Sequence, residues 1–442
     1  MKIEVIKSYA LFILVGLSLI LTYNIWTYKP GFDVHYAEEE RMYVPEDDFF
    51  LAGDTLSLED VIIPSTIIFH DQGKFFGFQE ANDLKNIYRE IGRWTIYDFS
   101  TGDSTGPPKH KRQIEIRYPT PLPMTIVPRL FTFDKGLKNL PSWSFNRIFM
   151  TFDKKQTMLK LHFMSIDGKQ QATATIQQAE KYELLLNYME NKKTLEEYIP
   201  FQAKSDWYIY IPSGSVKKAK KSFSVDVEAL NRAPNKLINA LFSDPSLVTR
   251  NLTKENIANY TDGRQQLQID SQRLNMEFTN PSQTQVKDSL NSIELIERTV
   301  IDINEHKGWT GEFHLESIDT ADQKITFLMY QNGEPILGSN RTTIEVERRK
   351  QDLFKYERPL FQISDLIVEE MTELPSGEKI IQLINQSQYN LKDIQDIRIG
   401  YHLKFQDRSS YIFTLEPAWF MKYNNTWVEI QSDEDLIYKE VS

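Results

Sequence analysis

Residues 8–28 read SYALFILVGLSLILTYNIWTY, an uncharged apolar run with a lysine on each side. At about 1.5 Å of rise per residue, a helix of this length covers the ~30 Å hydrocarbon core of a bilayer. The run ends in bulky residues, whereas a signal-peptide cleavage site needs small ones. Tyr23, Trp26 and Tyr28 are typical of the aromatic belt at a membrane interface. The run therefore predicts an uncleaved transmembrane signal anchor.

The segments beside this run set its orientation. The leader, residues 1–7, carries Lys2 and Lys7 against Glu4, and the far side is acidic and contains Pro and Gly. Under the positive-inside rule the leader stays in the cytoplasm and the rest of the chain faces out. We therefore expect a single-pass protein of the cell membrane, with a stalk over residues 29–55.

Small and polar side chains interrupt the anchor at Gly16, Ser18, Thr22 and Asn24. In lipid, small residues let helices approach closely, and polar residues form hydrogen bonds between helices. These four residues are our candidate partner-binding site in the membrane. The alternative is a passive tether, because the run contains no two Gly, Ala or Ser residues four apart.

Composition excludes several classes of function. The chain has 442 residues, with 51 Lys and Arg against 62 Asp and Glu, a net charge of −11 and no cysteine. The negative charge disfavours binding to nucleic acid. The lack of cysteine excludes disulfides, thiolate metal sites and cysteine nucleophiles.

The hydrophobic pattern beyond the stalk mixes helical and strand periods, which predicts an α+β fold with antiparallel sheets. Length allows three extracytoplasmic domains. A break at Pro200, before a strongly β-prone run, gives the first boundary. The predicted domains are an N-terminal domain over residues 56–204, a central domain over 205–345 and a C-terminal domain over 346–442.

The last two domains share an order of elements, a helix followed by an antiparallel meander, which predicts a duplication. In the central domain, Ser282 and Gln285 have the spacing of a capping box and predict the start of a long helix. Asn332-Gly333 predicts a hairpin turn. In the C-terminal domain, Glu416-Pro417-Ala418 is expected to separate two strands.

Motifs that carry chemistry have little support in the sequence. It contains no G-x-x-x-x-G-K-[ST], G-x-G-x-x-G or H-E-x-x-H pattern, and no two histidines lie three or four residues apart. The spacing G-x-S-x-G occurs at Gly102-Asp103-Ser104-Thr105-Gly106, but in a stretch whose Gly, Pro and Ser content predicts a loop, whereas a nucleophile elbow needs a strand followed by a helix. We therefore predict a protein that is not an enzyme and has no cofactor or metal. The alternative is an anchored module that binds the cell wall or hydrolyses it through carboxylates from distant segments.

Lys217-Lys218-Ala219-Lys220-Lys221 is a basic exception in an acidic chain. One interpretation is contact with an anionic wall polymer or lipid headgroup. The other is a solvated loop between two strands, because a lysine run alone has low specificity.

Three stretches of this sequence resemble the YycH (WalH) family. They are the exit of the anchor, LTYNIWTYKP at residues 21–30, the segment DVIIPSTIIFHDQGKFF at residues 60–76, and LEPAW at residues 415–419. The resemblance extends from end to end and is most specific at the anchor exit.

This resemblance implies a regulatory membrane protein of Gram-positive bacteria with one transmembrane helix and three extracytoplasmic domains. It implies that the last two domains are similar to each other and to the partner protein YycI. The implied function is to modulate the sensor histidine kinase WalK of the WalK–WalR system, which controls cell-wall metabolism, together with YycI and through transmembrane contacts. The family has no catalytic motif to carry over, and the sign of regulation stays open.

Overall fold

The computed structural model describes part of the chain in detail. The described residues are Ser18 and 54–137, 139–204, 207–225, 228–252, 257–270, 274–281, 289–349, 352–407 and 411–431. The chain divides into two units, Met1–Asp48 and Phe49–Ser442. Within the described ranges, no helix has the length and apolar character needed to cross a bilayer. The predicted anchor, apart from Ser18, and nearly all of the stalk lie outside these ranges.

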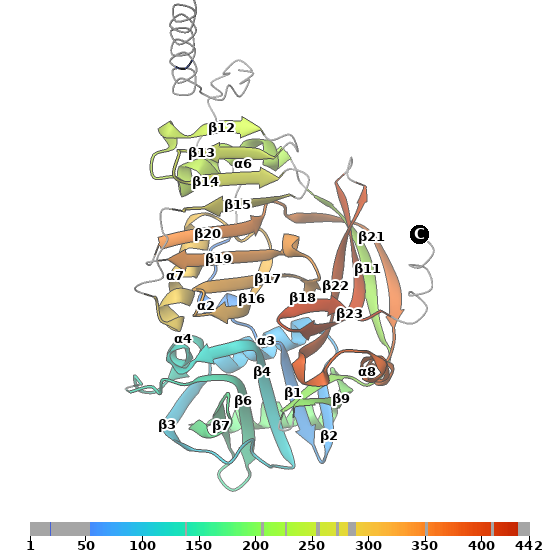
Figure 1. Cartoon of the computed structure of the whole chain (residues 1–442). Helices are drawn as coiled ribbons and strands as arrows, with labels where there is room; N and C mark the ends of the chain where they lie inside the picture. Colours follow the sequence, from blue (N-terminus) through green and yellow to red (C-terminus); the bar gives the residue numbers. More distant parts are fainter. Residues whose placement is uncertain are drawn as a thin grey trace, which may run out of the picture. The chain divides into compact units, whose positions relative to one another are not determined.

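The second unit begins with a sheet of ten strands in the order β10-β9-β2-β1-β4-β6-β7-β8-β3-β5 (Figure 1). Their bounds are Thr66–Asp71 (β1), Lys74–Phe78 (β2), Thr95–Asp103 (β3), Arg112–Pro123 (β4), Thr132–Phe133 (β5), Ser144–Asp153 (β6), Met158–Ser165 (β7), Gln170–Ile176 (β8), Leu195–Lys204 (β9) and Trp207–Pro212 (β10). The pairs are antiparallel except β3 with β5. The helices in this region are α2 (Leu58–Val61), α3 (Ala81–Gly92), α4 (Val127–Leu130) and α5 (Ala179–Asn191), with a 3-10 turn at Met124–Ile126.

A second sheet of fourteen strands follows. Its main order is β12-β13-β14-β15-β20-β19-β17-β18-β22-β23-β11-β21, with β16 paired to β17 and β24 paired to β23. The bounds are Val216–Val225 (β11), Thr249–Leu252 (β12), Ala258–Thr261 (β13), Gln266–Asp270 (β14), Asn275–Thr279 (β15), Glu312–Asp319 (β16), Lys324–Gln331 (β17), Glu334–Leu337 (β18), Thr343–Arg349 (β19), Asp352–Pro359 (β20), Ile363–Leu374 (β21), Ile394–Asp407 (β22), Ile412–Tyr423 (β23) and Thr426–Glu429 (β24). The helices are α6 (Glu228–Leu241), α7 (Ser292–Glu305) and α8 (Gly377–Gln386), with 3-10 turns at Pro245–Leu247, Asn340–Thr342 and Leu391–Asp393.

The α+β class is confirmed, but the sheets are mixed where antiparallel sheets were predicted. The exceptions are β3 with β5 and β18 with β22, which run parallel.

The sheets also cross the predicted domain boundaries. Strand β10 pairs with β9, so the first sheet extends to Pro212. Strand β11 pairs with β21 and β23 near the end of the chain. Helices α7 and α8 are each followed by three strands in antiparallel hairpins; the similarity of the last two domains stays a prediction.

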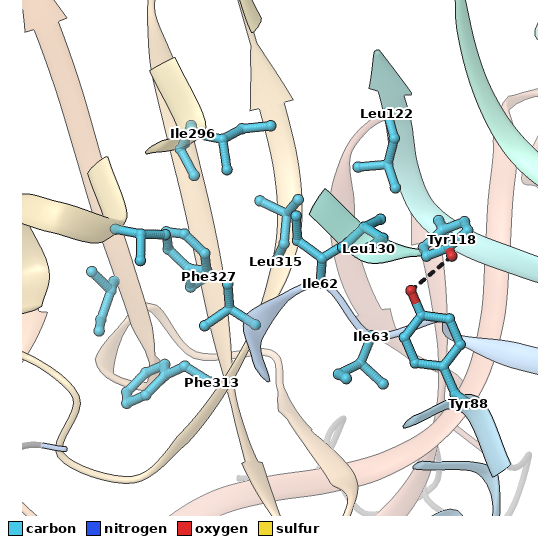
Figure 2. Close-up of a cluster of buried hydrophobic side chains, with 14 of the residues drawn as sticks. Ile62, Ile63, Tyr88, Tyr118, Leu122, Leu130, Ile296, Phe313, Leu315 and Phe327 are labelled. Atoms are coloured by element: carbon cyan, nitrogen blue, oxygen red, sulfur yellow. Dashed lines mark hydrogen bonds between the residues drawn. The ribbon is translucent and has the colours of Figure 1, made fainter. Parts of the chain in front are cut away.

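One hydrophobic core serves both sheets. Figure 2 shows Ile62, just after α2, between Leu130 of α4 and Leu315 of β16. In the same core, the hydroxyl groups of Tyr88 and Tyr118 lie 2.8 Å apart and form a buried hydrogen bond. The short α2 segment therefore fills the space between the sheets, and the two sheets bury their apolar faces together.

The long helix of the central region begins ten residues later than predicted. Residues 282–288 lie outside the described ranges, and Leu290 is not helical. The amide of Leu290 donates to Gln323 Oε1 over 2.7 Å, and Gln323 Nε2 donates to the Leu290 carbonyl over 3.1 Å. These bonds hold Leu290 out of the helix. The capping box is instead made by Asn291 and Glu294, at the start of α7.

The two strands predicted around Glu416-Pro417-Ala418 are a single strand, β23. Pro417 lies opposite Tyr401 of β22 and cannot donate a backbone hydrogen bond. On the other side of β23, pairing with β11 ends at Leu415 and pairing with β24 begins at Phe420. The strand therefore tolerates proline at a position without a neighbour on that side. The predicted turn at Asn332-Gly333 is confirmed, with both residues at positive φ between β17 and β18.

Buried charges join the two sheets. Asp396 Oδ1 lies 2.9 Å from Arg117 Nη1 of the first sheet, and Asp396 Oδ2 lies 2.6 Å from Arg398 Nη2. Glu316 Oε1 lies 2.6 Å from Lys422 Nζ. We call these five side chains the junction ion cluster. Each is at most 11% exposed. Nearby, α8 approaches β10 so closely that a Cβ at Gly377 would clash with the Pro212 carbonyl.

Burial and ion pairing act in opposite directions on Asp396. Burial alone would raise the pKa of its carboxyl group, but Arg117 and Arg398 outweigh burial and lower that pKa below its ordinary value. The carboxylate is therefore held in its charged form by two guanidinium groups, one from each sheet.

Substitution of Asp396 tests the importance of this cluster. We expect Asp396→Asn to lower the free energy of unfolding by about 3–5 kcal/mol, because it leaves the buried Arg117 without its carboxylate and Arg398 with only the more distant Glu316 (3.8 Å). Chemical denaturation of the full chain in detergent, followed by tryptophan fluorescence, measures the change. The control is Glu197→Gln, which breaks an exposed pair with Lys74 (3.2 Å) and should cost less than about 1 kcal/mol. Equal losses in the two variants would contradict the importance assigned to the cluster.

Candidate interaction surface

The predicted partner-binding residues of the anchor are not brought together by the described structure. Gly16, Thr22 and Asn24 lie outside the described ranges, and Ser18 is an exposed helical residue. Their role stays a prediction.

The basic run at Lys217–Lys221 forms part of strand β11, where a loop or a polyanion contact was expected. Lys218 Nζ lies 2.6 Å from Glu334 Oε1, Lys220 Nζ lies 2.7 Å from Glu416 Oε1, and Lys221 Nζ lies 3.5 Å from Glu369 Oε1. Three of the four lysines therefore stabilise neighbouring strands by ion pairing. Their charge is largely neutralised within the sheet.

Strand β21 has the longest exposed stretch among the described strands of the second sheet. It lies at the end of the sheet, and within the described ranges it pairs only with β11 (Figure 1). Residues 364–371 are all exposed. They include four large apolar side chains, Leu366 (48% exposed), Ile367 (49%), Val368 (54%) and Met371 (62%). We call this strand the β21 edge.

An edge of this kind can accept another strand. No strand of the described part of the chain pairs with the outer side of its twelve residues, and proteins usually protect such edges from pairing with other chains. Strand addition would supply main-chain hydrogen bonds, and the exposed apolar side chains would supply buried area. The β21 edge is therefore our candidate surface for a protein partner.

Charge on the edge favours a different chain over a second copy. The strand carries Asp365, Glu369, Glu370 and Glu373 and no basic residue. An antiparallel copy centred on Ile367 would set Glu369 of each copy opposite Asp365 of the other, and like charges across a strand pair are destabilising. A partner strand with apolar and basic side chains avoids this repulsion.

A cavity at the junction of the sheets contains the carboxylates that a wall hydrolase would need. Glu196 of β9 and Glu334 of β18 both line it, together with Lys218. Its volume is about 130 Å³. Small-molecule sites occupy about 300–1,000 Å³, so this cavity is smaller than a typical ligand site. Within the described ranges, no group of three metal-ligating side chains occurs either.

The environment of Glu196 is unusual for a carboxylate. Burial raises the pKa of Glu196 from 4.5 to about 7; Lys218 opposes this rise, whereas Glu334 and Glu80 add to it. Glu312, which also lies between the sheets, shows the opposite balance. Burial would raise the pKa of Glu312, but hydrogen bonds and charge from His314 and Lys85 lower it to about 2.

The sequence analysis did not identify the β21 edge. The run Leu366-Ile367-Val368 is an apolar signal, but a buried strand gives the same signal. The strand is exposed because it lies at the end of the sheet. Its neighbour there, β11, comes from a segment about 150 residues earlier in the chain. Local sequence does not report that position.

These features define a two-sheet α+β protein with buried ion pairs between its sheets and an open, acidic and apolar sheet edge. Models of known families identify it further. The model of the YycH protein, N-terminal domain, matches residues 4–194, and that of the YycH protein, C-terminal domain, matches residues 207–441. The chain belongs to the YycH family.

Individual relatives agree with this assignment. The chain is 23% identical to the two-component system WalR/WalK regulatory protein YycH of Bacillus subtilis (strain 168), over the whole chain and 98% of the relative. The crystal structure of YycH from Bacillus subtilis matches with a TM-score of 0.69 at 20% identity, covering 86% of this chain and 99% of that one. The second comparison shows a shared fold.

The two carboxylates predict pH effects of opposite sign. Because the pKa of Glu196 is higher in the folded than in the unfolded chain, its ionisation costs stability as the pH rises from about 4.5 to 7. We expect Glu196→Gln to gain stability relative to the natural chain through that window. Denaturation of the full chain in detergent at several pH values measures the difference.

Glu312→Gln is the matched control. The lowered pKa of Glu312 contributes stability above pH 4.5 that is lost as the pH falls toward 2. This variant should be less stable than the natural chain at pH 7, and the gap should close as the pH falls. A pH-independent difference for Glu196→Gln would contradict the raised pKa.

Proposed function

We propose that this protein is a non-enzymatic, membrane-anchored regulator that modulates the sensor histidine kinase WalK, together with a YycI-like protein. The observation that carries the proposal is the full-length similarity to a relative named as a WalR/WalK regulatory protein. Family models over both halves of the chain support it. We place the domains outside a Gram-positive cell membrane, in control of cell-wall metabolism.

The outer part of the protein would bind its partner through the β21 edge. Eight consecutive exposed residues and four exposed apolar side chains support this surface. The acidic residues of the edge favour a YycI-like partner that presents a strand with basic and apolar side chains. Backbone pairing would give affinity, and the side chains would give specificity.

The anchor would act on the kinase within the membrane. A regulator of this kind needs differential contact with the two signalling arrangements of the kinase. A hydrogen bond between membrane helices contributes about 0.6 kcal/mol on average. A tenfold shift needs about 1.4 kcal/mol, so several contacts of the anchor must differ between the two arrangements. Ser18, Thr22 and Asn24 offer the polar groups, and Gly16 allows close approach.

The β21 edge yields a direct test. We expect the double variant Val368→Lys, Met371→Lys to fold normally, because both side chains are more than half exposed, and to lose co-purification of the YycI-like protein from membranes. The matched control is Leu247→Lys, Leu252→Lys, which makes the same change at residues that are 62% and 61% exposed. Retention of the partner by the first variant would contradict a role for the β21 edge.

The anchor needs a separate test. We expect replacement of residues 8–28 by an unrelated apolar span of the same length to change the expression of the genes that the kinase controls, since it removes the specific helix contacts but keeps the topology. A chain with only the leader exchanged is the control. Unchanged expression with the unrelated span would leave the outer domains as the part of the protein that acts.

A further inference from the structure

A groove of about 650 Å³ lies on the first sheet, away from the β21 edge and the junction ion cluster. Its walls come from the loop before β4, the turn between β6 and β7, and one face of α5. The lining residues are Gln72, His110, Lys111, Arg112, Thr151, Phe152, Asp153, Lys154, Lys155, Lys160, His162, Tyr182 and Leu186. The volume is within the range of about 300–1,000 Å³ that small-molecule sites occupy.

Strand register brings basic residues from two distant segments into this groove. Gln113 of β4 pairs with Thr151 of β6, so Lys111 and Arg112 lie beside the end of β6. That end continues into the tight turn that carries Lys154 and Lys155. Lys111 and Arg112 end the basic run Lys109–Arg112, and about forty residues separate this run from Lys154 and Lys155. The groove is therefore a product of the fold.

The groove concentrates positive charge in an acidic protein. Five cationic side chains line it, from Lys111, Arg112, Lys154, Lys155 and Lys160, against one carboxylate, that of Asp153. The whole chain has a net charge of −11. Like charges at short range repel each other, so such a cluster weakens the fold unless an anion neutralises it.

Four of these cations have no internal counter-charge. Arg112 pairs with Asp71 over 3.0 Å and with Glu190 over 3.3 Å. Within the described ranges, the four lysines pair with no carboxylate. Asp153 Oδ1 accepts the backbone amides of Lys155 (2.9 Å) and Gln156 (3.3 Å), so it shapes the turn. The four lysine side chains line the groove and are exposed to solvent.

The floor of the groove is ordered and uncharged. Phe152 and Tyr182 pack edge to face with ring centroids 5.3 Å apart. His162 lies 3.3 Å from the Thr151 hydroxyl and 3.4 Å from Gln171 Oε1. Burial lowers the pKa of His162 to about 4, and positive charge from Lys160 and His110 contributes to this shift. The imidazole is therefore neutral at pH 7, and the positive charge lies on the rim.

We propose that this groove binds a phosphate-bearing ligand. Lysine ammonium groups bind phosphate as point charges, without the bidentate geometry that an arginine fork imposes on a carboxylate or phosphate. The only arginine of the lining, Arg112, is already engaged by two carboxylates. Four separate ammonium groups around a groove suit a ligand with more than one phosphate oxyanion. A soluble phosphate polymer and a lipid headgroup share this chemistry, and the inference does not depend on the regulatory function proposed above.

Calorimetric titration of the full chain in non-ionic detergent tests the proposal, with inorganic tripolyphosphate as the probe. We expect binding that weakens as salt is added. Lys154→Gln, Lys155→Gln should weaken it about tenfold through the loss of two charge contacts. The control Lys169→Gln, Lys193→Gln removes two exposed lysines of the same region that lie outside the groove and should keep the natural affinity.

Further probes identify the ligand class. Citrate should bind more weakly than tripolyphosphate, and equal affinity would overturn the assignment to phosphate. Micelles that contain phosphatidylglycerol, compared with phosphatidylcholine, separate the two sources. If the Lys154→Gln, Lys155→Gln variant loses binding to the micelles, the groove binds a lipid headgroup. If the variant loses only the binding of tripolyphosphate, the groove binds a soluble phosphate. No binding of either probe, or equal affinity of the groove variant and the control, would overturn the proposal.

Discussion

The buried carboxylate of Asp396 between two guanidinium groups is the interaction on which the arrangement of the two sheets depends. Arg117 comes from the first sheet, and Arg398 comes from the second. Removing such charges from water is expensive, and the cost is recovered only when every partner is in place. The Arg117–Asp396 pair and the shared apolar core both require the two sheets. Neither sheet therefore buries its charged and apolar side chains without the other.

Local sequence predicts the parts of this structure that are decided locally. The hairpin at Asn332-Gly333 needs two residues with positive φ, and that preference is visible in the residues themselves. The long helix was predicted to start at Ser282, whereas α7 begins after Leu290, whose backbone forms two hydrogen bonds with the distant side chain of Gln323. Pro417 likewise reads as a break, whereas it lies inside a strand where neither β11 nor β24 pairs with it.

The distribution of lysines shows why a functional surface is harder to predict than a fold. The run at Lys217–Lys221 is conspicuous in the sequence, yet three of its lysines are paired with carboxylates of other strands. Lys111 and Lys160 belong to separate segments, and the sheet register brings them to one groove, where no carboxylate of the described residues pairs with either. A charged functional surface is marked by side chains that lie close together without counter-charges. Which side chains do so depends on the pairing of strands that are distant in the sequence.

A regulator without catalysis has only binding energy with which to act, and that energy must differ between two states of its target. Strand addition at the β21 edge would supply affinity, but main-chain hydrogen bonds are similar for many partners, so they discriminate weakly. Contacts of the anchor are individually weak, yet they can differ between two arrangements of the kinase's membrane helices. Affinity would therefore come mainly from the outer domains, and selectivity between the two kinase states would come from the anchor. Binding at the β21 edge would raise the effective concentration of the anchor beside the kinase, so that weak membrane contacts could form.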